Sequence, residues 1–362
     1  MTPYLVLLAT VLALAALGAV TTAAAGRGAG PVERVGRARW TPFDLVLLGV
    51  LVVFAGSRVG VGTDYELYAA LWFRAGGDSL GAALDRSPQD PGFVALQHLL
   101  HRVGEGPEVM FWVTSAVTVG AMVLALKHGT RSFPAAIFLL VALGGYLAPF
   151  NLVRQGLAAA LLFLAATRYL DRRRWVFVAL VAAATGVHAS ALAVAVVLLV
   201  VRNVQPRPRV LAVLLAGALL AAQLYLTVPA VTRLAELLNP RYVQYVVQEE
   251  AGLGTYLVIG ARLLLVLYCY LHATLLTPLE RRCLVFATLG LAAQVVGTQS
   301  IAFARFDVYF ALFLVVPLAG LVRAAPDRLQ RAAVLGGSLV YMVLLIGNYY
   351  GLVPYRSTWW AG

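Results

Sequence analysis

The sequence predicts an all-α fold, a polytopic membrane helix bundle of about 11 to 12 transmembrane segments. Of the 362 residues, 61% are hydrophobic and only 12% are charged, and the mean hydropathy is +0.85. Apolar runs of about 15 to 25 residues recur along the chain, which is the length that a helix needs to cross a bilayer. Sheets are excluded for most of the chain because lipid cannot satisfy open strand edges. Residues 1–362 are therefore expected to form a single transmembrane domain.

The predicted spans follow the chain in order, beginning near its start. The first apolar run is long and no basic residue precedes it, which favours a membrane helix over a cleavable signal peptide. Each later span is another apolar run between polar or charged connections. The spans are 4–25, 43–57, 108–126, 134–150, 154–170, 175–201, 210–228, 255–276, 283–299, 306–322 and 332–350.

The charged residues divide between two kinds of connection. Most of the 28 lysines and arginines lie in short loops that the positive-inside rule assigns to the cytoplasm, and the acid-rich connections are expected outside. The net charge of +12 therefore orients helices in a cytoplasmic membrane and does not indicate a nucleic-acid partner. The basic loops are 27–39, 127–131, 168–174, 202–209, 281–282 and 323–331.

One apolar run, 175–201, has a basic loop at each end. A single crossing would place one of these loops outside, whereas a re-entrant hairpin of two short helices, broken near Thr185-Gly186, keeps both inside. The hairpin would carry His188 at its tip, and interrupted helices are tolerated where they line an enclosed or watery cavity. The alternative is one long tilted helix with a buried histidine.

Two outer connections, 58–107 and 229–254, are long enough to cover a site. The first contains Pro88 and Pro91 and an amphipathic stretch that begins at Phe93. Both are expected to be outer-face loops that carry interfacial helices.

The most informative polar segment is Asn151-Leu-Val-Arg-Gln155, at the start of an apolar span. A charged side chain in or beside hydrocarbon is costly, so Arg154 is a functional candidate. On a helix, residues 151, 154, 155 and 158 would share one face, with small Ala158 leaving room for a ligand. A guanidinium near the positive end of a helix suits a phosphate or diphosphate. The alternative is an arginine that reaches the outer headgroups.

Other polar residues map to the same predicted membrane face. His188 and Ser190 interrupt a run of alanine and valine, although a hydrogen-bonded core histidine is the alternative. Arg305 lies at another outer helix end, where it could simply pair with Asp307. Together with Asp64, the placement of these groups on one side predicts a shared site. The weaker candidates are Arg58 and Arg262.

Several chemistries are not supported by the motifs present. The chain has no Walker loop for ATP-driven transport, no His-Glu-x-x-His or Cys/His cluster for a metal, and no Gly-x-Ser-x-Gly elbow for a hydrolase. It also lacks an Asp-x-Asp pair for a nucleotide-sugar donor held by a divalent metal. No metal and no cofactor are therefore predicted.

The chain resembles the EpsG family of bacterial exopolysaccharide proteins, which is similar to the Wzy polymerases. The most specific part is Asn151-x-x-Arg-Gln155 followed at a distance by His188-x-Ser190. Asp90 keeps a carboxylate where the family often has glutamate. The other matching elements are Gly62-Thr-Asp-Tyr65 with Tyr68, Asp90-Pro-Gly-Phe93, Ala158, Arg305 with Tyr309, and Pro354-Tyr355.

The resemblance implies a metal-independent glycan polymerase at the outer face of the bacterial cytoplasmic membrane. Such a protein is expected to join oligosaccharide repeats carried on undecaprenyl diphosphate, as donor and acceptor, and to release lipid diphosphate within the bilayer. Asp64 or His188 would be the base, and Arg154 and Arg305 would stabilise the departing diphosphate. A chain-length regulator is a candidate partner. The substrate-binding candidates are Asn151, Gln155, Tyr65, Tyr68, Ser190, Tyr309, Arg262 and Arg58.

Two other functions compete with this one. A transporter or flippase of polyprenyl-diphosphate-linked sugars would also use arginines, but its signature is paired inverted repeats with matching broken helices, of which only the run 175–201 is evident. A membrane acyltransferase would use a histidine base but would leave the two outer arginines, Arg154 and Arg305, unexplained.

Overall fold

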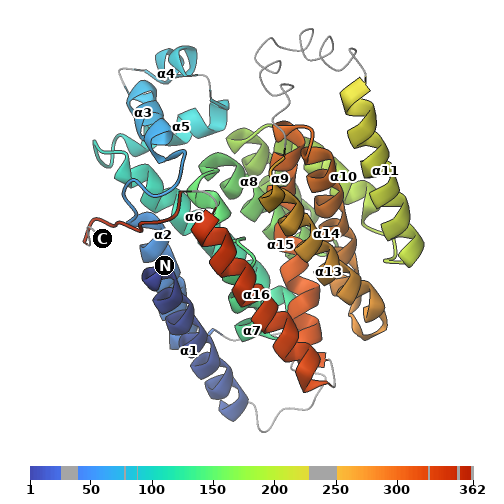
Figure 1. Cartoon of the computed structure of the whole chain (residues 1–362). Coiled ribbons are helices and arrows are strands. Elements are labelled where there is room, and N and C mark those ends of the chain that lie inside the picture. The colour runs from blue at the N-terminus through green and yellow to red at the C-terminus, as the bar shows by residue number, and fades with distance from the viewer. Residues whose placement is uncertain are drawn as a thin grey trace.

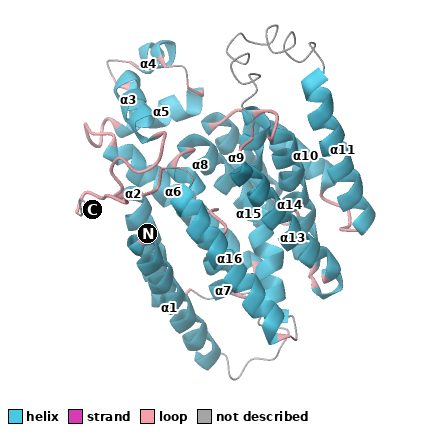
Figure 2. Ribbon diagram, viewed as in Figure 1, coloured by secondary structure: helices cyan, strands magenta, loops and turns pink. Residues whose placement is uncertain are grey.

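The computed structural model describes residues 1–25, 40–76, 79–87, 89–227, 251–324, 327–348 and 351–359. Within these ranges the chain forms fifteen α-helices and no strand, which confirms the all-α prediction (Figures 1 and 2). Most of the predicted outer loop 229–254 lies outside the described residues. The helices are α1 (Thr2–Ala25), α2 (Pro42–Gly56), α3 (Tyr65–Ala75), α4 (Leu80–Arg86), α5 (Pro91–Leu100), α6 (Glu108–Gly129), α7 (Phe133–Ala142), α8 (Val153–Leu164), α9 (Arg174–Val187), α10 (Ser190–Val201), α11 (Pro208–Thr227), α13 (Leu253–Leu271), α14 (Pro278–Gly297), α15 (Ile301–Ala324) and α16 (Arg328–Asn348).

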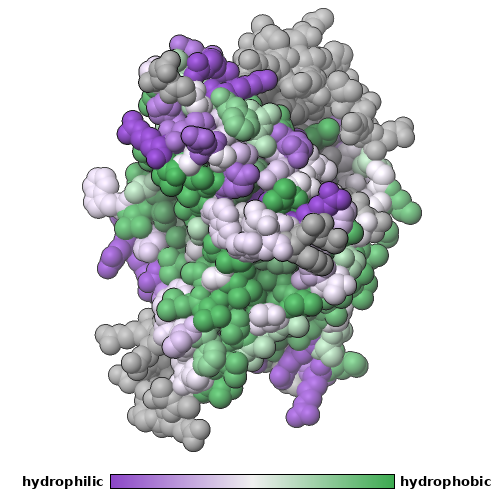
Figure 3. All heavy atoms as spheres, turned by 90° about the vertical axis from the view of Figure 1, so that its left-hand side faces the viewer, coloured by the Kyte–Doolittle hydropathy of each residue, from purple (hydrophilic) through white to green (hydrophobic). Residues whose placement is uncertain are grey.

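Five of the described helices are long and apolar enough to cross a membrane, and five shorter apolar helices accompany them. Figure 3 shows a broad band of hydrophobic side chains between polar residues above and below it. Such a band is what a bilayer-embedded surface requires, because lipid replaces water around it. The five long segments are Thr2–Ala23, Glu108–Gly129, Leu253–Leu271, Phe303–Ala324 and Arg328–Gly347.

The predicted span 134–150 is not one helix. Helix α7 ends at Ala142, and the chain then turns through Gly144, whose φ of 78° lies in the left-handed region. A side chain with a Cβ rarely adopts that backbone conformation, so glycine permits the turn. A short 3-10 turn, Ala148–Phe150, contains Pro149 and leads into α8. The helix that the sequence predicted is therefore divided, and the turn at its end forms one wall of the site.

The run 175–201 is a hairpin of two helices, α9 and α10. His188 has extended backbone angles (φ −154°, ψ 111°) and ends α9, so the break falls at His188-Ala189 and not at Thr185-Gly186, which lie within α9. The far ends of the two helices lie together, because Arg282 binds both the Asp171 carboxylate and, at 3.0 Å, the Arg202 carbonyl. His188 therefore lies at the tip, as predicted for the hairpin.

Those basic loops that the structure describes gather at one end of the bundle, here called the basic end. Arg131, before α7, forms a salt bridge to Glu280 in the first turn of α14, and Lys127 at the end of α6 forms one to Asp44 near the start of α2. Both carboxylates also complete capping boxes, which satisfy backbone amides at the two helix starts.

The opposite end, here called the site end, carries helices α3, α4 and α5 from the predicted loop 58–107 (Figure 1). Helix α5 packs directly on α9, and a Cβ on Gly92 would lie 2.5 Å from the Gly186 carbonyl oxygen. Only glycine at position 92 allows the two backbones to approach this closely. The contact places the start of α5 against the tip of the α9–α10 hairpin. That helices α3 to α5 lie at a membrane interface remains a prediction.

The C-terminal segment 351–359 fastens the start of the 58–107 segment. The Val59 amide donates to the Arg356 carbonyl at 3.0 Å, and the Gly62 amide donates to the Gly351 carbonyl at 3.1 Å. The Tyr355 hydroxyl donates to the Phe54 carbonyl at 2.7 Å. These bonds hold the backbone that leads into α3 beside the start of α8.

Candidate functional site

Asp90, the residue before α5, is the centre of the polar cluster at the site end. Its Oδ2 lies 2.9 Å from Arg154 Nη1 in the first turn of α8 and 3.0 Å from His188 Nδ1 at the hairpin tip. Its Oδ1 accepts the Ala189 amide at 3.1 Å, which satisfies a free N–H at the start of α10. One carboxylate thus joins three elements. We refer to Asp90, Arg154 and His188 as the Asp90 cluster.

The Asp90 carboxylate does not cap its own helix, although Asp90 occupies the N-cap position of α5. An aspartate at a helix N-cap usually accepts an amide of the first turn, but Asp90 makes no such bond to α5. Both its oxygens serve the other two elements instead. Burial alone would raise the pKa of Asp90, but hydrogen bonds from His188 and the Ala189 amide, with the charges of His188 and Arg154, bring the pKa below its ordinary value. The carboxylate is therefore held ionised.

The Asp90 carboxylate also fixes the orientation of the histidine. Because a carboxylate accepts, Nδ1 of His188 carries a proton, so in the neutral form of the ring Nε2 is the basic nitrogen. The side chains of the cluster are partly exposed, at 18% for Asp90, 24% for Arg154 and 27% for His188. A ligand can therefore reach them.

The prediction that residues 151, 154, 155 and 158 share one helix face is wrong for Asn151, because α8 begins only at Val153. Asn151 lies in the preceding turn, where its Oδ1 accepts the Thr63 amide at 2.8 Å. Arg154 turns toward Asp90, whereas the Gln155 side chain donates to the Arg305 carbonyl at 2.6 Å. The motif therefore connects three neighbours and does not present one surface.

Three predicted hydroxyl groups surround the Asp90 cluster. Ser190 Oγ and the Tyr309 hydroxyl are 2.9 Å apart, which joins the hairpin tip to α15. The Tyr68 hydroxyl accepts the Arg154 backbone amide at 3.5 Å. Arg305 lies four residues before Tyr309 on α15 and so shares its face of the helix.

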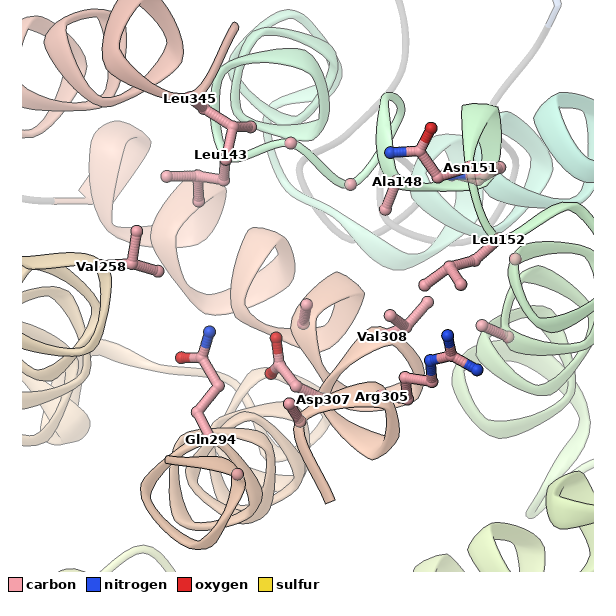
Figure 4. Close-up of a pocket in the computed structure, with 18 of the residues that line it drawn as sticks. Leu143, Ala148, Asn151, Leu152, Val258, Gln294, Arg305, Asp307, Val308 and Leu345 are labelled. Atoms are coloured by element: carbon pink, nitrogen blue, oxygen red, sulfur yellow. The ribbon is translucent and has the colours of Figure 1, made fainter. Parts of the chain in front are cut away.

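A cavity of about 520 Å³ lies beside the start of α8; its described lining includes Leu152 and Gly156, on either side of Arg154 in the sequence, but none of the three cluster residues. Its described lining contains four charged residues: Asp64, Arg262, Arg305 and Asp307. Figure 4 shows Gln294 and Asp307 extending into the same space from neighbouring helices, while Arg305 points away from Gln294. Apolar side chains from the turn after α7 and from α13 and α16 complete the wall; these include Leu143, Val258 and Leu345.

The alternative in which Arg305 pairs with Asp307 is not the one that the structure shows. The two residues are two positions apart on α15, so they leave the helix in different directions. Asp307 instead pairs with Arg262 of α13, and both are buried. Arg262 is thus part of the cavity wall, as a member of an ion pair within the bundle.

The structure does not bring Arg58 or Tyr65 into the cavity. The Arg58 guanidinium is buried, with its Cζ 4.9 Å and 4.7 Å from the ring centres of Phe111 and Phe150. Tyr65 stacks on Phe111 at a centroid distance of 4.4 Å. The positions of both residues favour a structural role beneath the site.

Sequence reasoning left three residues out of the proposed site: Asp90, Gln294 and Asp307. Asp90 lies in the matched Asp-Pro-Gly-Phe segment, and Asp307 lies two residues from Arg305, so the sequence offered a reason to include both in the site. Gln294 lies in an apolar helix with no motif around it. Within the described ranges, no group of three or more histidine, cysteine or carboxylate side chains is placed to hold a metal ion.

Taken together, the fold and the site define a helical membrane protein with a partly exposed Asp–His–Arg cluster and an adjoining cavity at one end. The chain belongs to the EpsG family, whose family model matches residues 43–357, nearly the whole chain. No curated protein and no solved structure matches the chain. Membership supports a role of the polysaccharide-polymerase type.

Proposed function

We propose that the protein joins oligosaccharide repeat units carried on undecaprenyl diphosphate at the outer face of a bacterial cytoplasmic membrane. The observation that carries the proposal is the Asp90 cluster, which combines an oriented histidine with an arginine beside a cavity at the end away from the basic loops. The apolar wall formed by the turn after α7 and by α13 and α16 suits the lipid-linked end of such a substrate.

The proposed reaction is a glycosyl transfer. A hydroxyl oxygen of the acceptor sugar forms a bond to the anomeric carbon of the donor, and the bond from that carbon to the lipid diphosphate breaks. His188 Nε2 takes the hydroxyl proton, while Asp90 keeps the ring oriented and stabilises its positive charge. We prefer His188 to Asp64 as the base because the Asp64 side chain forms a hydrogen bond only with its neighbour Thr63, at 3.2 Å.

The departing diphosphate gains negative charge, which the arginines are placed to stabilise. Arg154 uses Nη1 for Asp90, and its Nε has no protein partner. Arg305 is exposed on the face of α15 that meets the hairpin tip. Fixed cations near the leaving oxygen lower the barrier because they need no rearrangement during the reaction. The donor bond is already activated, so the transfer needs no ATP.

The test is a polymerisation assay in lipid nanodiscs supplied with an undecaprenyl-diphosphate-linked oligosaccharide. We expect mass spectrometry to show longer glycans and released lipid diphosphate. His188→Gln keeps a donor for Asp90 but removes the base, so turnover is expected to fall by about 10² to 10⁴. The matched control is His272→Gln, because His272 Nδ1 contacts only the Tyr268 carbonyl of its own helix, at 3.0 Å.

Full turnover by His188→Gln would contradict the assigned base. Movement of the intact lipid-linked sugar between leaflets, with no change in glycan length, would contradict a polymerase and support the flippase alternative.

A further inference from the structure

The cavity wall holds polar atoms that the protein itself does not satisfy. Asn151 Nδ2, Gln294 Oε1 and Asp307 Oδ1 are buried and have no hydrogen-bond partner. They come from three elements, namely the turn before α8, helix α14 and helix α15, and all three residues line the same cavity. Buried polar groups in proteins are normally paired, so a set of unpaired atoms around one cavity indicates a ligand that completes them.

The charges of the cavity argue against an anion as that ligand. Arg262 is tied to Asp307, so this deeper cation is already neutralised within the protein. The described lining holds two carboxylates, Asp64 and Asp307, against the two guanidinium groups of Arg262 and Arg305. A diphosphate is better placed between Arg154 of the Asp90 cluster and Arg305. The space between Asn151, Gln294 and Asp307 suits a neutral ligand instead.

The unsatisfied atoms also specify the hydrogen bonds of the ligand. Asn151 Nδ2 offers a donor, while Gln294 Oε1 and Asp307 Oδ1 offer acceptors. A hydroxyl group can donate and accept at once, so adjacent sugar hydroxyls fit this mixture, whereas a phosphate would meet the Asp307 carboxylate oxygen, which repels it. The volume of about 520 Å³ lies within the range of small-molecule sites.

We infer that this cavity is a sugar subsite, in which Asn151, Gln294 and Asp307 bind hydroxyl groups of the lipid-linked oligosaccharide. The inference rests on the proposed function and adds which residues select the repeat unit. Of the three residues, Gln294 is the most direct to test. Its Oε1 has no protein partner, and Gln294→Met keeps the length and neutrality of the side chain while removing its hydrogen bonds.

The experiment compares two probes on protein in nanodiscs: undecaprenyl diphosphate without sugar, and undecaprenyl diphosphate carrying the oligosaccharide. For Gln294→Met we expect the dissociation constant of the sugar-bearing probe to rise about three- to tenfold, as one hydrogen bond predicts. The dissociation constant of the sugar-free probe should not change. The matched control is Gln299→Met, because Gln299 lies two residues beyond the end of the same helix and outside the described lining of the cavity.

A second variant, Asn151→Asp, keeps the oxygen that accepts the Thr63 amide and removes the unpaired donor on the opposite wall. This variant is expected to weaken the binding of the sugar-bearing probe more than the binding of the sugar-free probe. Equal loss for both probes in both variants would overturn the inference, because the cavity would then hold the diphosphate. No change for either probe in either variant would also overturn it.

The binding assay separates the two proposals because it needs no turnover. A sugar-dependent loss in Gln294→Met, with no polymer made by the unaltered protein, would retain the subsite and reject the polymerase. Polymer formation by the unaltered protein, with no sugar-dependent loss of binding in Gln294→Met, would retain the polymerase and reject the subsite.

Discussion

The two ends of the bundle each contain a carboxylate at the start of a helix that pairs with an arginine. The two pairs differ in their exposure and in how many of their hydrogen-bonding atoms the protein itself satisfies. At the basic end, Glu280 is 1% exposed and accepts Arg131 Nε at 2.8 Å and Nη2 at 2.7 Å, together with the Thr277 amide. At the site end, Asp90 is 18% exposed, and Arg154 reaches it through one nitrogen, Nη1.

The difference separates a structural pair from a functional one. Both oxygens of Glu280 and two nitrogens of Arg131 are used within the protein, and Arg131 Nη2 also donates to the Leu275 carbonyl at 3.0 Å. Arg154 Nε is instead without a partner, and the Asp90 carboxylate orients a partly exposed histidine beside a cavity. The same residue types fasten helices at one end and are available to a ligand at the other.

The largest expected effect comes from replacing the two arginines in parallel. Arg154→Ala should lower turnover by at least about 10²-fold, because one fixed donor to a developing charge contributes that much, while stability falls by only about 1 kcal/mol for a partly exposed pair. Arg131→Ala should lower stability by about 3 kcal/mol, because it leaves a buried carboxylate unpaired. Thermal unfolding and the polymerisation assay measure the two quantities.

The distinction between a structural and a functional arginine would be contradicted if both arginine variants lost stability equally and the folded fraction of Arg154→Ala kept full turnover. Arg154→Lys sharpens it, because lysine keeps the charge but cannot reproduce the planar guanidinium. We expect Arg154→Lys to recover stability more completely than turnover.

A smaller effect is expected from the glycines that bring α5 to the hairpin tip. Gly92→Ala places a methyl group 2.5 Å from the Gly186 carbonyl oxygen, so α5 must shift and carry Asp90 away from His188. We expect turnover to fall about tenfold, since small misplacements of positioning groups are costly in rate. In Gly186→Ala the nearest atom, Gly92 Cα, is 3.9 Å from the new methyl group, and the helix should tolerate the change.

The two glycine variants should therefore differ, although they lie across the same contact. Equal turnover in both would show that the close approach of α5 and α9 does not position the Asp90 cluster.

The smallest effect concerns the pH dependence of stability. The pKa of Asp90 in the folded protein is below its ordinary value, so ionised Asp90 stabilises the fold above that ordinary value. The contribution is lost as the pH falls through the lowered pKa. The thermal midpoints of the unaltered protein and of Asp90→Asn should therefore differ at pH 7 and converge as the pH falls below the ordinary aspartate pKa. A constant difference over that range would show that the charge of Asp90 does not stabilise the site end.

The sequence predicted the Asp90 cluster only in part, because the cluster is built from distant segments. Arg154 and His188 were evident, since a charged or titratable residue in an apolar run is costly and so conspicuous. Asp90 lies in a polar connection, where an aspartate is ordinary, and it is 64 residues from Arg154 and 98 from His188. Gln294 and Asp307 were missed as cavity residues because their unpaired atoms are visible only when the facing helices are in place.

What the sequence determined by itself was the class of fold and the gathering of basic loops at one end, whereas it left residues 175–201 open between a hairpin and one long helix. The fold class and the placement of the loops follow from local composition, because lipid requires apolar helices and loop charge sets their orientation. Only the tertiary structure decided that Asp90 joins Arg154 to His188, that Asp307 pairs with Arg262 and not Arg305, and that Asn151 faces Gln294 across a cavity. Such pairings depend on the angles and depths at which helices pack, which side-chain type and spacing along one segment do not specify.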